Sequence, residues 1–190
     1  MKTKLIIAQL FLFWGAFAQI NWQQLSGPYG CHVAQSIAHN GAVYITTNDG
    51  QAIGSIYKTI NQGISWSDVS GPLKRPYLRN FAAIGNQLFI AADTSVFVTN
   101  NGGASWQDVS NTLPDYFPIS RITSFNNRLL ATLYDGNGYE TLYYSDNGGA
   151  QWHITTVVTP VNASFRNFCQ DGNKLWAATL QGVMLSTDSG

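Results

Sequence analysis

Three arginines stand at the starts of short apolar segments: Arg79 in LRNF, Arg121 in SRIT and Arg166 in FRNF. A guanidinium group binds a carboxylate through two parallel hydrogen bonds, so converging arginines can hold an acidic ligand. Arg121 is one residue out of step with the other two, and in a strand such a shift turns a side chain to the opposite face. The sequence therefore favours arginines that face solvent or a neighbouring repeat over a shared anion site.

Two aspartates, Asp135 in YDGNG and Asp171 in QDGNK, are the candidates for a catalytic pair of carboxylates. Glycoside hydrolysis needs two carboxyl groups that face each other across a cleft. Both aspartates lie beside glycine and asparagine, where an aspartate usually caps its own turn. Glu140 is the only glutamate and lies in the same YDGNGYE segment as Asp135, which limits the acid–base chemistry available.

Metal and cofactor chemistry finds no support in the sequence. His32, His39 and His153 are scattered without the spacing of metal ligands. No phosphate-binding loop, dinucleotide motif or Ser–His–Asp order is present. Cys31 and Cys169 lie far apart in the chain, and either a disulfide or two buried free thiols is compatible with the sequence. We therefore expect no cofactor and no metal ion.

The segments that would position these residues recur along the chain. TINQGISW spans 59–66, TNNGGASW spans 99–106, SDNGGAQW spans 145–152, and STDSG at 186–190 begins a fourth copy. A fixed period of about 40–46 residues indicates a repeat architecture. Each copy follows a run of Val, Ile, Phe, Tyr and Thr, and further runs of this kind, bounded by Gly, Asn and Asp, lie upstream. The pattern predicts four short strands in each unit.

This unit resembles the Asp-box, or BNR, repeat, Ser/Thr-x-Asp-x-Gly-x-Ser/Thr-Trp. The Asp position of the box holds asparagine in the first three copies and aspartate only in the last. The resemblance implies an all-β fold, a β-propeller whose blades have four strands each. The residues that match the box, and that we interpret as structural, are Thr59, Asn61, Gly63, Trp66, Thr99, Asn101, Gly103, Trp106, Ser145, Asn147, Gly149, Trp152, Ser186, Asp188 and Gly190.

Turn chemistry accounts for every position of the box. Asn or Asp can hydrogen-bond its own turn backbone, and glycine adopts positive φ without a steric clash. A serine or threonine satisfies another backbone group, and a tryptophan anchors the turn by burying its ring. In families that carry this box it lies on the rim, away from the central axis where ligands bind. Carbohydrate stacking by the tryptophans is the alternative interpretation.

The chain divides into a leader and the repeats. Basic residues at Lys2 and Lys4, an apolar run over 5–14 and small residues at 16 and 18 are typical of a secretory signal peptide, predicted over 1–18. Residues 19–190 contain the repeats and no stretch long enough to span a bilayer. NWQQLSGP at 21–28 resembles SWSDVSGP at 65–72, which predicts an outer strand at 21–26. The blades are expected at about 32–70, 77–110, 119–157 and 165–190.

Because the fourth copy stops inside its turn, the sequence predicts an incomplete ring, a truncated piece of a longer propeller. Basic and acidic residues number 10 each, so the chain without Lys2 and Lys4 carries a net charge of about −2. This balance gives no attraction to nucleic acid or to anionic membranes.

Asp-box propellers include sialidases, xyloglucan-cleaving glycosidases, sortilin-like receptors and non-catalytic assembly factors, and a fold does not decide among them. The resemblance to sialidases would give the three arginines a substrate carboxylate to hold, but no Phe-Arg-Ile-Pro motif precedes the first box. We expect a secreted or cell-surface interaction module, without catalytic activity, that binds an extracellular glycan or protein. The alternative is a glycoside hydrolase of the sialidase or xyloglucanase type, with some catalytic residues in blades outside this sequence.

Overall fold

The computed structural model describes residues 22–28, 31–48, 54–73, 77–155 and 164–187, and these contain strands and turns but no helix. The predicted signal peptide at 1–18 lies outside the described residues, as do Asp188 and Gly190 of the fourth repeat. The predicted all-β fold class is confirmed. Within the described part, the strands form four antiparallel sheets.

Strands that follow each other in sequence are neighbours in each sheet. The first sheet contains β1 (His32–His39), β2 (Ala42–Asn48), β3 (Gly54–Thr59) and β4 (Ser67–Asp68). The second contains β5 (Leu78–Ile84), β6 (Gln87–Ala92), β7 (Ser95–Thr99) and β8 (Gln107–Asp108). The third contains β9 (Ile119–Phe125), β10 (Arg128–Tyr134), β11 (Glu140–Ser145) and β12 (His153–Ile154). The last contains β13 (Phe165–Asp171), β14 (Lys174–Thr179) and β15 (Gly182–Ser186).

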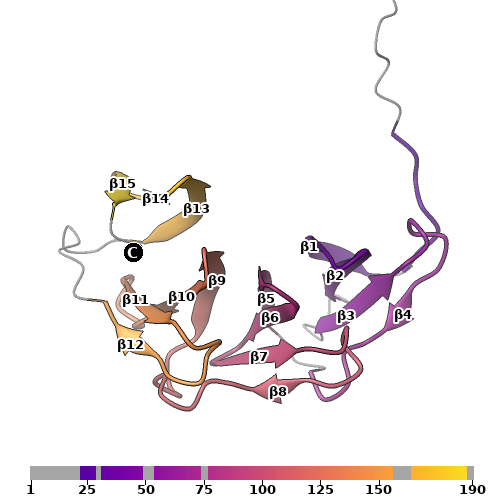
Figure 1. Cartoon of the computed structure of the whole chain (residues 1–190), viewed down its shortest axis with the longest axis horizontal. Coiled ribbons are helices and arrows are strands. Elements are labelled where there is room, and N and C mark those ends of the chain that lie inside the picture. The colour runs from indigo at the N-terminus through magenta and orange to yellow at the C-terminus, as the bar shows by residue number, and fades with distance from the viewer. Residues whose placement is uncertain (1–21, 29–30, 49–53, 74–76, 156–163, 188–190) are drawn as a thin grey trace, which may run out of the picture.

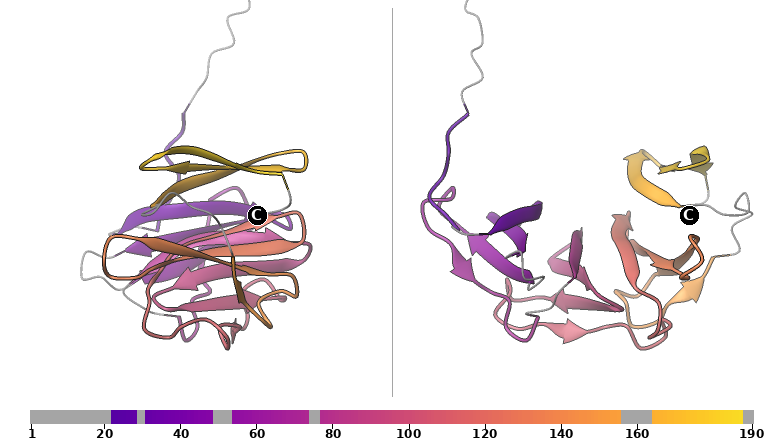
Figure 2. Two further views of the ribbon diagram at one scale, coloured as in Figure 1. Left: turned by 90° about the vertical axis from the view of Figure 1, so that its left-hand side faces the viewer. Right: turned by 180° about the vertical axis from the view of Figure 1, so that it is seen from behind.

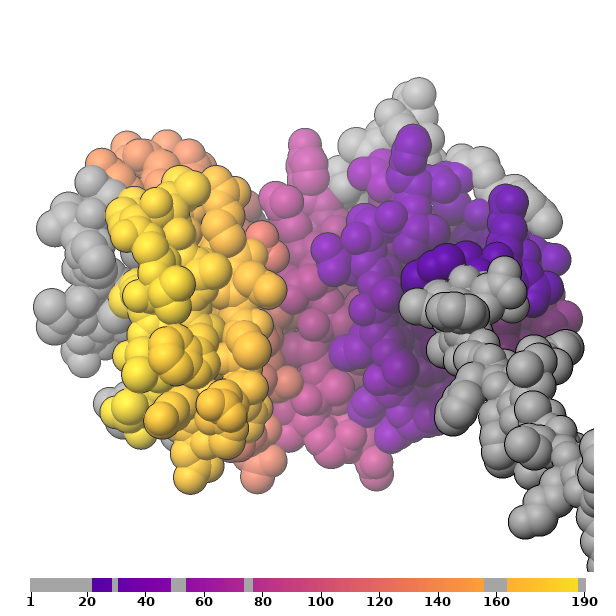
Figure 3. Space-filling model, turned by 90° about the horizontal axis from the view of Figure 1, so that it is seen from above, coloured from indigo at the N-terminus to yellow at the C-terminus, as the bar shows by residue number. Residues whose placement is uncertain are grey.

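The four sheets stand side by side around an arc (Figure 1), with β1, β5, β9 and β13 on its inner side and the short strands β4, β8 and β12 on its outer side. Figure 2 shows from two further directions that the ring is not closed. In Figure 3, which looks into the open side of the arc, the yellow last sheet and the purple first sheet stand on either side, with the second sheet visible behind them. The arrangement is that of propeller blades around part of a circle.

The core of the molecule lies between neighbouring sheets. In β6, Leu88 and Ile90 pack toward the first sheet, whereas the alternating residues Phe89 and Ala91 pack toward the third. All four side chains are almost completely buried. A central blade is covered on both faces, so its second strand is a nearly continuous apolar run instead of an alternating one. Burial of this kind stabilises a fold by about 25 cal/mol for each Å² of apolar surface removed from water.

Residues 22–28 are not part of any sheet, whereas the sequence comparison predicts an outer strand at 21–26. The Trp22 side chain is 94% exposed. Leu25 nevertheless lies against Gly63, just as Val69 lies against Gly103 and Val109 against Gly149. The segment therefore occupies the place of an outer strand beside the first sheet. The outer strands β4, β8 and β12 each pair with the third strand of their own sheet. Residues 22–28 have no such partner among the described residues, so they do not form a strand.

A pairing irregularity occurs near the start of every inner strand. The register shifts between Val33 and Gln35 in β1 and between Phe165 and Asn167 in β13. In β5 the shift lies between residues 78 and 81. In β9 it lies between residues 119 and 121, which pair with the adjacent residues Leu133 and Thr132 of β10. A bulge leaves a residue without a ladder partner and redirects its side chain.

One asparagine ties the second sheet to the third. The side-chain amide of Asn80 donates a hydrogen bond to the Ile122 carbonyl, and its oxygen accepts one from the Ile122 amide at 3.0 Å. Ile122 is fully buried, so its backbone groups have no access to water. A single side chain thus satisfies both backbone groups of a core residue in another sheet.

We expect Asn80→Ala to reduce the free energy of unfolding by roughly 1–3 kcal/mol, because it leaves a buried donor and a buried acceptor unsatisfied. Hydrogen exchange at the Ile122 amide should accelerate in the variant. Asn80→Asp is the matched control, since it keeps the acceptor for this amide and loses only the donor. Unchanged exchange at Ile122 in the alanine variant would show that the bridge contributes nothing.

Both cysteines are free thiols. Cys169 is exposed on β13, and Cys31 is half-buried just before β1. The structure thus shows no disulfide between them, and the expectation of two buried thiols is wrong for Cys169.

Candidate functional site

The repeated segments form turns between the third and fourth strands of the first three sheets. In the first turn the Thr59 hydroxyl donates to Asn61 Oδ1 at 2.9 Å and accepts the Gly63 amide at 3.0 Å. Asn61 Oδ1 also accepts the Ser65 amide at 3.0 Å, and its Nδ2 donates to the Ser65 hydroxyl at 2.9 Å. Asparagine in place of aspartate keeps the acceptor oxygen and adds this donor. The first turn is therefore closed by side chains that lie within seven residues of each other.

The second and third turns repeat these bonds. Thr99 and Ser145 each accept a glycine amide at 2.9 Å, from Gly103 and Gly149 respectively. Asn101 accepts the Ser105 amide at 3.0 Å, and Asn147 accepts the Gln151 amide at 2.9 Å. The glycines have φ of +83°, +90° and +87° in chain order, a conformation that side-chain-bearing residues rarely adopt.

The tryptophans that end the second and third repeated segments point toward the preceding sheet. Trp106 Nε1 donates to the Val69 carbonyl and Trp152 Nε1 to the Val109 carbonyl, both at 2.8 Å. The Trp152 side chain is only 4% exposed, so its ring face is not available for stacking on a sugar. Trp66 Nε1 is buried without a partner among the described residues.

The two ends of the strands differ in chemistry. At one end lie the turns just described, together with the turns that join each inner strand to the second strand; we call this the repeat-turn face. At the other end lie the links between sheets and the connections from second to third strands. We call this end the tyrosine face because it carries Tyr77, Tyr116, Tyr134 and Tyr139, all of them exposed.

Backbone hydrogen bonds connect the tyrosine face from the second sheet to the third. The Asp93 amide donates to the Tyr77 carbonyl at 3.1 Å, and the Asp93 carbonyl accepts the Ile119 amide at 2.8 Å. The Tyr134 amide donates to the Pro118 carbonyl at 2.9 Å, and the Asp135 amide donates to the Tyr139 carbonyl at 3.0 Å. The backbones of Tyr77, Tyr134 and Tyr139 therefore belong to a hydrogen-bonded frame, and Tyr116 lies two residues before Pro118 of the same frame.

The three arginines do not converge. Arg79 is exposed at the bulge of β5, with its guanidinium 5.6 Å from the ring centre of Tyr77. Arg166 is exposed at the bulge of β13 and makes no hydrogen bond or ion pair with the described residues. Arg121 is half-buried and donates to the Phe165 carbonyl at 3.2 Å, which joins the third sheet to the last. Its position in the ladder, opposite Thr132, corresponds to that of Asn80 and not to that of Arg79.

The two candidate aspartates do not form a facing pair. Asp135 lies on the tyrosine face, where Oδ1 accepts the amides of Asn137 at 2.9 Å and Tyr139 at 3.1 Å. Asp171 ends β13 on the repeat-turn face. These faces are separated by the length of a strand, about 20 Å for seven residues. The Glu140 carboxylate accepts a hydrogen bond from the Phe165 amide at 2.6 Å and so links the third sheet to the last.

Among the described residues, Asp146 and Tyr143 have shifted pKa values. The hydrogen bond from Arg128, formed at 2.7 Å, lowers the pKa of the Asp146 carboxyl below its usual value. Burial raises the pKa of Tyr143, and the neighbouring Tyr116 adds to the increase.

Within the described part of the chain, no three His, Cys, Asp or Glu side chains are grouped to hold a metal ion. No helix there is long and apolar enough to cross a membrane.

Sequence reasoning missed the tyrosine face. Its four tyrosines share no spacing and fall outside the repeated segments. The available signal is positional, because Tyr77 and Tyr116 precede inner strands, Tyr134 ends a second strand and Tyr139 precedes a third strand.

The chain matches no protein-family model and no curated protein sequence. Its structure is similar to solved structures of β-propeller proteins. YCF48 from Cyanidioschyzon merolae is 13% identical with a TM-score of 0.62, and the match covers 89% of this chain and 57% of that one. A structure described as YCF48 bound to D1 peptide is 16% identical with a TM-score of 0.60, covering 88% and 54%.

An ancestral GH74 enzyme is 21% identical with a TM-score of 0.67, and the match covers 91% of this chain and 25% of the enzyme. The chain therefore spans about a quarter of this enzyme and just over half of the two YCF48 chains. Likeness at these identities concerns the fold, and enzymes and other proteins share it. The chain has the fold of a β-propeller, with its described sheets in an open arc.

Proposed function

We propose that this protein is an exported binding module, without catalytic activity, that holds a peptide segment of a partner protein on its tyrosine face. The observation that carries the proposal is the set of exposed tyrosines on a backbone frame, with the exposed guanidinium of Arg79 beside the Tyr77 ring. Export rests on the signal-peptide pattern of residues 1–18.

Tyrosine and arginine are the residues that protein interfaces concentrate. A tyrosine ring offers a large contact area at a low cost in conformational entropy, and its hydroxyl can bond a partner's backbone. Arginine and tyrosine are also over-represented among the residues that dominate binding energy. The solved structure of YCF48 with D1 peptide supports the idea that a propeller of this general shape can hold a peptide.

The hydrolase alternative has weaker support in the described residues. The likeness to the GH74 enzyme concerns fold only, at 21% identity. Asp135 and Asp171 lie on opposite faces, and Glu140 is engaged with the Phe165 amide. A retaining or inverting glycosidase needs its two carboxyl groups within about 5–10 Å of each other.

A phage-displayed library of linear peptides, selected on the immobilised chain, tests this function. We expect enriched peptides whose affinity falls at least tenfold, or about 1.4 kcal/mol, in the double variant Tyr77→Ala, Arg79→Ala. Ile64→Ala is the matched control, because Ile64 is 76% exposed on the repeat-turn face.

Equal loss of binding in the Ile64 variant would contradict the assignment to the tyrosine face. Failure to enrich any peptide, together with release of reducing sugar from xyloglucan, would favour the hydrolase instead.

A further inference from the structure

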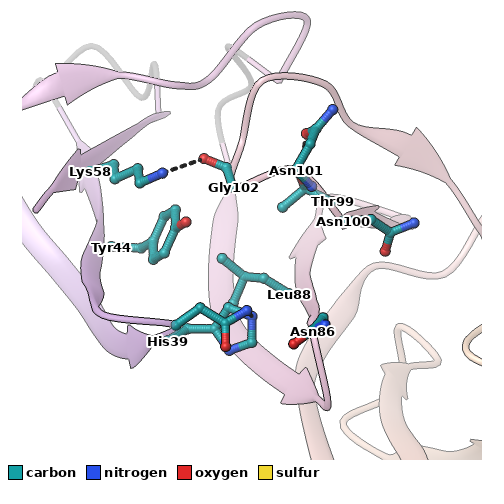
Figure 4. A pocket seen from close by; sticks show the side chains of 10 residues that line it. His39, Tyr44, Lys58, Asn86, Leu88, Thr99, Asn100, Asn101 and Gly102 are labelled. Carbon is teal, nitrogen blue, oxygen red and sulfur yellow. Dashed lines mark hydrogen bonds between the residues drawn. The ribbon is translucent and has the colours of Figure 1, made fainter.

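A polar pocket opens between the first and second sheets, on the repeat-turn face and away from the tyrosine face (Figure 4). Its volume is about 220 Å³. The turns at 39–40, 86 and 99–102 form its rim, and Tyr44, Lys58 and Leu88 form its wall. Among the described residues, no aspartate or glutamate lines it.

The pocket exists because this junction differs from the next one. Tyr44 and Lys58 are opposite each other in the ladder of β2 and β3. The equivalent pair of the second sheet is Phe89 and Val98, also opposite each other, and both belong to the apolar core. The junction of the first and second sheets thus contains a hydroxyl and an ammonium group where the equivalent positions at the junction of the second and third sheets contain only hydrocarbon side chains.

Tyr44 is a buried side chain with an unused polar end. The residue is 2% exposed and packs in the core cluster with Ile56 and Phe81. Its hydroxyl makes no hydrogen bond with any described residue and points into the pocket (Figure 4). The hydroxyl oxygen is not one of the buried polar atoms that lack a partner, so it is open to the pocket although the ring is buried. A tyrosine hydroxyl in this position can donate a hydrogen bond to a ligand atom and accept one from it.

Lys58 places a positive charge beside this hydroxyl. Its Nζ donates to the Gly102 carbonyl at 3.2 Å and lies 5.5 Å from the ring centre of Tyr44. An ammonium group has three donors, so two remain for a ligand. Gly102 has φ of +70°, and a Cβ there would lie 2.7 Å from Nζ and 3.2 Å from the Tyr44 hydroxyl. The glycine therefore keeps this part of the pocket open.

The rim supplies amide groups. Asn86 and Asn100 are exposed and make no hydrogen bond with the described residues, but the Asn100 side chain points away from Tyr44 and Lys58 (Figure 4). Each amide offers donors and an acceptor, the combination that matches a hydroxyl group, which both donates and accepts. Asn101 is different, because its side chain already bonds Ser105 within the turn.

We propose that this pocket binds a sugar acid, one uronic acid unit, with its carboxylate on Lys58 and Tyr44 and a hydroxyl on the rim amide of Asn86. The charge of Lys58, with no acidic residue among the described lining residues, selects an anion, and the amide of Asn86 selects a hydroxyl group over apolar surface. The volume, below the 300–1,000 Å³ of pockets for drug-sized ligands, suits a single ring. The site is separate from the tyrosine face and does not depend on the function proposed for that face.

Calorimetric titration with glucuronate tests the proposal, with methyl glucoside and acetate as probes that lack the carboxylate or the hydroxyls. We expect glucuronate to bind at least tenfold more tightly than either. Tyr44→Phe and Lys58→Val should each weaken glucuronate binding at least tenfold. Both variants copy the pair found at the next junction, Phe89 and Val98, so they should keep the fold and the melting temperature.

Lys174→Met is the matched control for charge, because Lys174 is exposed in another turn of the repeat-turn face. It should leave glucuronate binding unchanged. The proposal is overturned if glucuronate does not bind the unaltered chain, if acetate or methyl glucoside binds equally well, or if Lys58→Val retains full affinity.

Discussion

Trp152→Ala should reduce the free energy of unfolding by about 3–5 kcal/mol, the range for removing a large buried aromatic side chain. The Trp152 ring lies in the core cluster between the second and third sheets, and its Nε1 donates to the Val109 carbonyl. The variant would leave a cavity at this junction and an unsatisfied carbonyl. Denaturant unfolding followed by circular dichroism gives the value.

Two further variants, one at this junction and one at the junction of the first and second sheets, separate packing from hydrogen bonding. Trp152→Phe keeps most of the apolar contact and loses the bond to Val109, so it should cost only about 1–2 kcal/mol. Trp106→Ala should cost less than Trp152→Ala, because Trp106 is only half-buried although it makes the equivalent bond to Val69. A Trp152→Ala variant with an unchanged unfolding midpoint would refute the view that this ring locks neighbouring sheets together.

Gly149→Ala should destabilise the protein by about 2–5 kcal/mol, from two causes. A non-glycine residue at the observed φ of +87° costs about 1–2 kcal/mol. A Cβ at Gly149 would also lie 2.7 Å from Cγ2 of Val109 and 3.2 Å from its carbonyl oxygen. The oxygen belongs to the backbone and cannot move aside without shifting the preceding sheet, and such overpacking costs about 1–3 kcal/mol. Thermal unfolding of the variant measures the sum.

Gly85→Ala is the matched control. Its φ of +54° also lies in the left-handed region, but a Cβ there would meet nothing within 4 Å. The control should therefore show the backbone cost of about 1–2 kcal/mol alone. If both variants lost equal stability, the close approach of the third turn to the second sheet would have no energetic consequence.

Leu25 shows what a comparison of the repeats within the sequence can predict and what it cannot. The match of 21–28 to 65–72 predicts that Leu25 corresponds to Val69, and the two residues do make equivalent contacts, with Gly63 and Gly103. The same match predicts a strand, which is not observed. The side-chain contact depends on one neighbouring sheet, whereas strand pairing also requires a partner strand.

The candidate charged residues show a different limit. Arg121 is one residue out of step with Arg79 in sequence, and the structure shows Arg79 exposed beside Tyr77 and Arg121 bonded to the Phe165 carbonyl of the next sheet. Asp135 and Asp171 both precede glycine, yet they lie on opposite faces. Sequence indicates which turn each residue occupies, but pairing of such groups depends on strand direction and on the sheet that carries them.

The sequence alone determined the all-β propeller class, the repeated turns and the strands of the four sheets with their order, although not the absence of a strand at 21–26. These features depend on interactions between residues close in the chain, such as the bonds of Thr59 and Asn61 and the positive φ of Gly63, so local residue patterns are sufficient. The tertiary structure alone decided what meets across the junctions. Tyr44 and Phe89 occupy equivalent positions, but the Tyr44 hydroxyl reaches a pocket beside Lys58 and the turn at 99–102, whereas Phe89 packs with Val98 in the core between the second and third sheets. Contacts between sheets join residues some 40 positions apart, and no local pattern specifies them.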